Sequence, residues 1–113
     1  MIKILHNNRC SKSRCGLEIV KNSGKDYEIV NYLVDTPTIE DIKNILKLLN
    51  IEPIALIRTN EAIWKDNYKG LTLTDEEVIN AMVKHPKLIE RPIVINGDKA
   101  VIGRPPELIT TII

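Results

Sequence analysis

The chain has 113 residues, of which 43% are hydrophobic and 27% charged, and its formal net charge is +1. This length fits one globular domain with one core, and so small a net charge provides no field that would attract nucleic acid. No apolar run approaches the ~20 residues of a membrane span, and the polar residues that soon follow Met1 argue against a secretory signal, so we expect a cytoplasmic protein.

The N-terminal third predicts two strands joined by a helix. Ile2–Leu5 has the apolar character of a buried strand, and residues 27–32 predict a second strand after the helix stop at Asn22-Ser23-Gly24. Between them, Leu17 and Val20 lie three residues apart, as on one face of a helix. A strand, helix, strand unit of this length makes the two strands parallel.

The middle of the chain predicts helices. Residues 38–41, which begin with Thr38, cap a helix with an apolar face, and residues 54–69 form a less regular stretch. Thr74 begins a capping box for a helix that runs to about Lys84. Further along, residues 91–95 and 99–102 flank the tight turn Asn96-Gly97-Asp98 and predict an antiparallel hairpin. Prolines after Gly103 predict the first turn of a terminal helix.

Cys10 is the strongest candidate for a reactive side chain. It lies where the loop after the first strand enters a helix, and unpaired N–H groups and the helix dipole favour an anion there. Arg9, Lys12 and Arg14 add positive charge around the thiol. Both effects lower a thiol pKa, so this setting favours a nucleophile over an ordinary buried cysteine.

The second cysteine, Cys15, does not form an evident pair with Cys10. Residues five apart on a helix lie ~7.5 Å apart along its axis, and their side chains point in different directions. The spacing is also not Cys-x-x-Cys, and neither thiol has zinc-ligand partners. We interpret Cys15 as a small packing residue, with a redox role as the alternative.

Residues 6–14, His-Asn-Asn-Arg-Cys-Ser-Lys-Ser-Arg, resemble the active-site loop of the glutaredoxin-coupled arsenate reductases, His-Asn-x-x-Cys-x-x-Ser-Arg. Segments 56–60, 85–94 and 103–105 extend the resemblance over nearly the whole chain, in the family's order. The resemblance implies an α/β, thioredoxin-like fold, with a mixed four-stranded sheet flanked by helices. A single domain over residues 1–113, with a helical insertion at about 38–86, is then expected.

The resemblance also implies roles for individual residues. Cys10 would be the catalytic nucleophile, and His6 would modulate its thiol. Arg14 would support the loop, and Pro92 would be a cis-proline facing the cysteine. Arginine suits bidentate capture of tetrahedral oxyanions. By resemblance, the oxyanion would be held by Arg58, Arg91 and Arg104.

The implied reaction is the reduction of arsenate to arsenite through a thioarsenate on Cys10. Glutathione would attack this adduct as a co-substrate, and glutaredoxin would reduce the resulting mixed disulfide. No metal and no bound cofactor are expected, and the expected partners are arsenate, glutathione and glutaredoxin. Neither nucleic acid nor a membrane is an expected partner, and we expect a monomer.

Three other functions were weighed, and for two of them the residues that follow Cys10 are informative. A phosphatase-type Cys-x5-Arg loop is excluded because Gly16 occupies the arginine position and Arg14 comes too early. Spx-type regulators, which bind RNA polymerase and sense oxidants, usually carry a Cys-x-x-Cys pair, whereas Ser13 occupies the second position here. A regulator of this type and a thiol reductase with another substrate stay as the alternatives.

Overall fold

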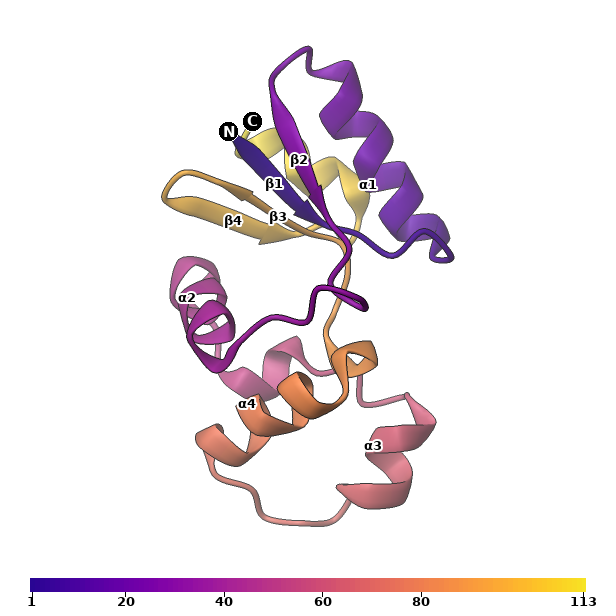
Figure 1. The fold of residues 1–113 in the computed structure, drawn as a ribbon, viewed down its shortest axis with the longest axis vertical. Coiled ribbons are helices and arrows are strands. Elements are labelled where there is room, and N and C mark those ends of the chain that lie inside the picture. Colours follow the sequence, from indigo (N-terminus) through magenta and orange to yellow (C-terminus); the bar gives the residue numbers. More distant parts are fainter. The chain divides into compact units, whose positions relative to one another are not determined.

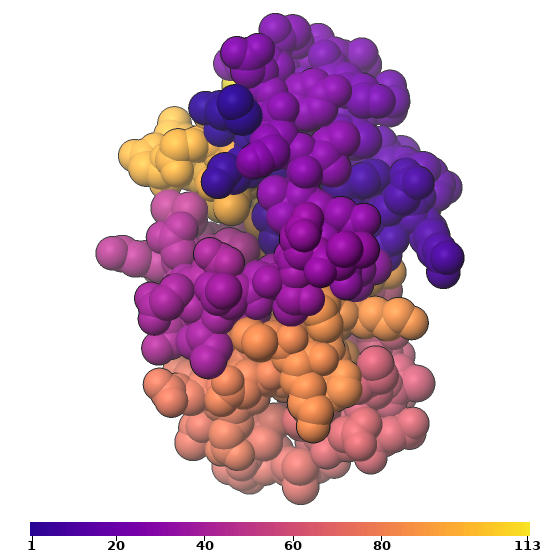
Figure 2. All heavy atoms as spheres, viewed as in Figure 1, coloured from indigo at the N-terminus to yellow at the C-terminus, as the bar shows by residue number.

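The structure, a computed structural model, describes residues 1–113, which form two compact units. The first unit consists of Met1–Asp35 and Arg91–Ile113, and the second of Thr36–Glu90 (Figures 1 and 2). The second unit therefore contains the segment that the sequence predicts as a helical insertion.

The first unit is built on a mixed four-stranded sheet, as predicted. Its strands are ordered β2-β1-β3-β4; β1 and β2 are parallel, whereas β3 is antiparallel to both β1 and β4. Leu5 at the end of β1 pairs with Ile93 at the start of β3, which pairs in turn with Ile102 at the end of β4. The chain thus leaves β1, enters β3 and leaves β4 at one edge of the sheet. The strands are β1 Ile2–Leu5, β2 Tyr27–Val30, β3 Ile93–Asn96 and β4 Lys99–Ile102.

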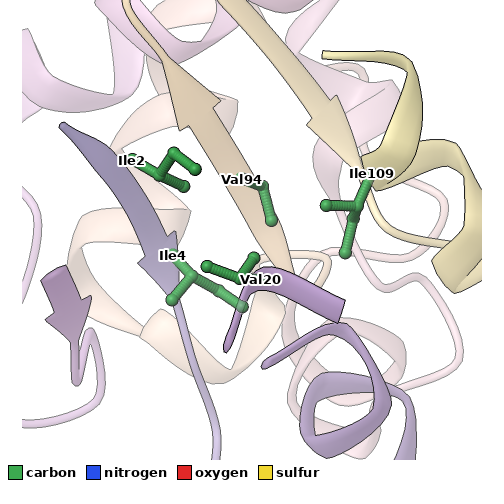
Figure 3. Packing of buried hydrophobic residues seen from close by; sticks show 5 residues of the cluster. All are labelled: Ile2, Ile4, Val20, Val94 and Ile109. Atoms are coloured by element: carbon green, nitrogen blue, oxygen red, sulfur yellow. The ribbon is translucent and has the colours of Figure 1, made fainter. Parts of the chain in front are cut away.

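The core of this unit lies between the sheet, α1 (Ser11–Asn22) and the 3₁₀ helix η3 (Pro106–Thr111). Side chains two apart on a strand share a face of the sheet, so β1 directs two isoleucines into this core. Each apolar side chain buried here contributes about 1.5–3 kcal/mol to folding. The fully enclosed cluster is Ile2, Ile4, Val20, Val94 and Ile109 (Figure 3).

The structure corrects two strand boundaries predicted from sequence and the type of the terminal helix. β2 ends at Val30, because the carbonyl of Asn31 accepts the N–H groups of Val34 and Asp35 and turns the chain. β3 begins at Ile93 and not at residue 91, because the proline before it has no N–H for the ladder. The terminal helix is 3₁₀ over Pro106–Thr111, a form typical of short segments.

The second unit is helical, and α2 and α4 pack together in it. Thr38 and Thr74 form the N-terminal capping boxes of α2 and α4 with Asp41 and Glu77, so both predicted helix caps are confirmed. Residues 54–69, predicted as a less regular stretch, contain most of the 3₁₀ helix η1 and all of α3. None of these helices has the length and the apolar character that a transmembrane segment requires. The elements are α2 Ile39–Leu49, η1 Pro53–Leu56, α3 Ala62–Asn67, α4 Asp75–Lys84 and η2 Pro86–Leu88.

Candidate active site

Cys10 is the N-cap residue of α1, with an extended backbone (φ −98°, ψ 121°). Its N–H donates to the carbonyl of Asn7 at 3.0 Å, and its carbonyl accepts the N–H of Arg14 at 3.0 Å. The loop from β1 to α1 projects at the molecular surface (Figure 2), and the thiol itself is partly buried. The loop turn and the first turn of α1 therefore both fix the backbone of Cys10, from which the thiol projects.

The environment of Cys10 favours the thiolate. Burial alone raises the pKa of a thiol, but the N–H of Ser13, the guanidinium of Arg91 and the N–H of Lys12 all lower it. Together these three groups outweigh the effect of burial, so the pKa of Cys10 lies below its ordinary value. This is the expected behaviour of a cysteine at a helix N-terminus beside a cation.

Two arginines from the other end of the chain meet at this thiol. The Nη2 atom of Arg104 lies 3.6 Å from Sγ of Cys10, and its Nε donates to the carbonyl of Arg91 at 2.7 Å. Arg91 contacts Cys10 through its own guanidinium, and both arginines are partly buried. The arginines flank the β3–β4 hairpin, and the strand register brings both of its ends to the edge where β1 leads into the cysteine loop.

His6 reaches the cysteine loop through Ser13. The Nδ1 atom of His6 lies 2.6 Å from Oγ of Ser13, and the N–H of Asn7 donates to the same oxygen at 3.0 Å. Because Oγ accepts from Asn7, its own hydrogen is available to donate to Nδ1 of His6. Sequence reasoning missed Ser13, although its position in the Cys-x-x-Ser-Arg pattern was a usable signal. Both side chains are buried.

Arg14 and Pro92 occupy supporting positions. The Nη1 atom of Arg14 donates to the carbonyl of Asn8 at 3.0 Å, within the cysteine loop. Pro92 is buried, and its peptide bond with Arg91 is cis. Two glycines contact its ring: a Cβ at Gly16 would lie 2.8 Å from Cγ of Pro92, and a Cβ at Gly103 would lie 2.9 Å from it. The N–H of Gly103 also donates to the carbonyl of Pro92 at 2.8 Å.

Two further residues singled out from the sequence are Arg58 and Cys15. Arg58 belongs to the second unit, where its Nε donates to Oε1 of Glu61 at 3.2 Å, so its oxyanion role stays a prediction. Cys15 is exposed on α1, and its interpretation as a packing residue is therefore wrong. Cys15, five positions after the N-cap residue Cys10, points toward solvent. No group of three or more histidine, cysteine or carboxylate side chains is arranged to hold a metal ion.

The sequence model of the ArsC family matches residues 5–112. The chain belongs to the ArsC family. Among its relatives, the uncharacterized protein YfgD of Escherichia coli is 42% identical over 99% of this chain and 96% of its own length. An arsenate reductase of Haemophilus influenzae is 42% identical over 97% of each chain.

A solved structure of an arsenate reductase from Vibrio cholerae superposes on this ArsC-family chain with a TM-score of 0.95. The two are 38% identical, and the match covers 99% of this chain and 97% of the other. The predicted fold class, a thioredoxin-like α/β fold, is thereby confirmed. The comparisons also confirm the family membership that was predicted from the cysteine loop and the three later segments.

Proposed function

We propose that this protein reduces arsenate to arsenite, with Cys10 as nucleophile and with glutathione and glutaredoxin as the source of reducing equivalents. The observation that carries the proposal is the convergence of Arg91 and Arg104 on a thiol of lowered pKa. An arsenate reductase among the relatives at 42% identity supports the choice of substrate. We place the reaction in the cytoplasm and expect the enzyme to act as a monomer.

The first step forms a bond between sulfur and arsenic. The thiolate of Cys10 attacks the arsenic of arsenate, and one oxygen takes up protons and leaves as water. Arg91 and Arg104 would stabilise the negative charge that remains on the other oxygens, as preorganised donors do in oxyanion holes. Planar guanidinium groups are suited to this task because each can donate two parallel hydrogen bonds. The proposed roles of Arg58 and His6 are to add a further oxyanion contact and to modulate the thiol.

The second step transfers electrons to arsenic. The sulfur of glutathione attacks the sulfur of Cys10, the sulfur–arsenic bond breaks, and its electron pair remains on arsenic, which departs as arsenite. Two thiols are thereby oxidised to a mixed disulfide between Cys10 and glutathione. A thiol of glutaredoxin then takes over the glutathione moiety and releases the Cys10 thiolate. An external reductant is required because no second thiol of this chain stands in a Cys-x-x-Cys arrangement with Cys10.

A reconstituted assay tests the proposal. Arsenate is supplied with glutathione, glutaredoxin, glutathione reductase and NADPH, and the consumption of NADPH is followed after each component is omitted in turn. We expect turnover only in the complete mixture, none with Cys10→Ser, and retained turnover with Cys15→Ser. Turnover that persists in Cys10→Ser contradicts the mechanism. Absence of arsenate turnover in the wild type, with capture of the RNA polymerase alpha subunit in a pull-down, would favour the regulator instead.

A further inference from the structure

Gly103 is a buried residue that directly precedes Arg104, in the segment between the end of β4 and the start of η3. The structure leaves no space for a side chain at this position. A Cβ atom there would lie 2.9 Å from Cγ of Pro92, 2.9 Å from Cδ1 of Ile109 and 3.2 Å from Cγ1 of Ile109. Nonbonded carbon atoms are best placed about 3.5–4.0 Å apart, so a larger residue fits only if one of these segments moves.

The ring of Pro92 is closely packed by other parts of the same unit. Pro92 and Ile109 are both fully buried, and Ile109 belongs to the apolar cluster in Figure 3. From α1, a Cβ at Gly16 would meet the same two atoms, 2.8 Å from Cγ of Pro92 and 3.0 Å from Cδ1 of Ile109. Residues 103–105, by contrast, belong to no helix or strand. A side chain at Gly103 would therefore displace its own segment more easily than the proline ring.

Backbone hydrogen bonds hold the segment at Gly103 in this close approach. The N–H of Gly103 donates to the carbonyl of Pro92 at 2.8 Å. The N–H of the next residue, Arg104, donates to the carbonyl of Ile102 at 2.9 Å, so Gly103 is the central residue of a three-residue turn. The position and direction in which the chain enters Arg104 are thus set by the contact between Gly103 and Pro92.

The side chain of Arg104 depends on this backbone position. Its Nε donates to the carbonyl of Arg91 at 2.7 Å, and its Nη2 lies 3.6 Å from Sγ of Cys10. The N–H donors of a guanidinium lie in one plane, so both contacts are met only from a narrow range of backbone positions. Hydrogen bonds also weaken steeply as their geometry departs from the optimum. A shift of the turn before Arg104 would therefore reach the thiol.

We propose that Gly103 is a positioning residue: because it has no Cβ, the turn before Arg104 lies directly against Pro92, and this close approach holds the guanidinium of Arg104 at Sγ of Cys10. The consequence for arsenate rests on the function proposed above. The contact between Arg104 and the thiol does not depend on it. Gly103 has no side chain that could reach the thiol, so it acts through Arg104.

The test is Gly103→Ala, and the matched control is Gly16→Ala. Either alanine would place its Cβ 2.8–3.0 Å from the same two atoms, but only Gly103 directly precedes Arg104. The midpoint of Cys10 alkylation against pH should rise in Gly103→Ala, because a hydrogen bond from a cation favours the thiolate. Arsenate kcat/KM should fall on the order of tenfold, the size expected for a lost hydrogen bond to a charged group. Gly16→Ala should leave both values close to those of the wild type.

A double-mutant cycle with Arg104→Lys separates positioning from general packing. If Gly103 acts through Arg104, Gly103→Ala should cause little further change in the Arg104→Lys background. An equal loss in both backgrounds, or equal effects of Gly103→Ala and Gly16→Ala, overturns the proposal. If wild-type protein reduces no arsenate, the proposed function fails, and the alkylation midpoints still decide the role of Gly103.

Should Gly103→Ala not fold, the double variant with Ile109→Val is compared with Ile109→Val alone, because the shorter side chain lacks Cδ1. NMR spectra of the wild-type protein supply a measurement that needs no variant. The Nε proton of Arg104 should exchange slowly with water, and its signal should shift as Cys10 is titrated. A rapidly exchanging Nε proton that does not respond to the ionisation of Cys10 overturns the proposal.

Discussion

The Nη2 atom of Arg104 lies 3.6 Å from the Sγ atom of Cys10, although 94 positions separate the two residues in the sequence. The same arginine donates through Nε to the carbonyl of Arg91, so it joins the two segments that surround the thiol. Arg104 thus contacts both the thiol and the backbone of Arg91, whose guanidinium lowers the pKa of the same thiol.

Replacing Arg91 or Arg104 by lysine should reduce arsenate turnover strongly. Lysine keeps the charge but lacks the planar fork, and the loss of one oxyanion contact typically costs ~3 kcal/mol, or about a hundredfold in rate. Arg9→Lys is the matched control, because Arg9 is exposed beside the same thiol. Steady-state kinetics measure the effect. Turnover near the wild-type value in both lysine variants would mean that these arginines are structural.

The pH dependence of Cys10 alkylation should reveal a lowered thiol pKa. The reaction follows the thiolate fraction, so its midpoint in the folded protein should lie below that of the same cysteine in the urea-unfolded chain. Peptide mapping after alkylation between about pH 5 and pH 10 distinguishes Cys10 from Cys15. A folded midpoint equal to or above the unfolded one would mean that burial outweighs the N–H groups and Arg91.

The same shift predicts how stability depends on pH. Because the folded pKa of Cys10 is lower than the unfolded one, ionisation stabilises the folded state fully above the unfolded pKa. This contribution should disappear as the pH falls through the folded pKa. The stability of wild type relative to Cys10→Ser, measured by urea unfolding across that interval, should therefore rise with pH. A flat or falling difference would contradict the direction of the shift.

Removing the hydroxyl of Ser13 should destabilise the cysteine loop. Its Oγ binds both His6 and the N–H of Asn7 inside the protein, and Ser13→Ala leaves these groups without that partner. We expect a loss of about 1–3 kcal/mol in the free energy of unfolding, together with slower alkylation of Cys10. Ser11→Ala is the control, because Ser11 lies exposed in the same helical turn. Equal effects of the two substitutions would show that the buried hydroxyl contributes little.

Alanine at Gly16 provides a test in which two effects have opposite signs. Within α1, alanine is favoured over glycine by about 1 kcal/mol of helix propensity. A Cβ there would, however, lie 2.8 Å from Cγ of Pro92 and 3.0 Å from Cδ1 of Ile109, and overpacking of a core typically costs about 1–3 kcal/mol. We therefore expect net destabilisation in urea unfolding. Ile109→Val removes one of the two clashing atoms and should restore part of the loss in the double variant. A stabilised Gly16→Ala would mean that the Pro92 segment moves easily.

The sequence by itself determined the features that depend on near neighbours. The capping box at Thr74 begins a helix because Thr74 and Glu77 satisfy each other's backbone N–H groups within one turn. The turn at Asn96-Gly97-Asp98 likewise determines the β3–β4 hairpin, and Gly97 adopts the positive φ (64°) that such a turn requires. The position of Cys10 at the start of a predicted helix, among cationic residues, already indicated a reactive thiol, and the family resemblance added the expected role of catalytic nucleophile.

The tertiary structure decided which distant side chains meet at that cysteine. Pairing of Leu5 with Ile93, and of Ile93 with Ile102, brings three chain segments to one edge of the sheet. A local pattern carries no information about this register, because it depends on burying β1 and β3 against α1 at the same time. The exposure of Cys15 is decided in the same way, since it depends on which face of α1 packs against the rest of its unit.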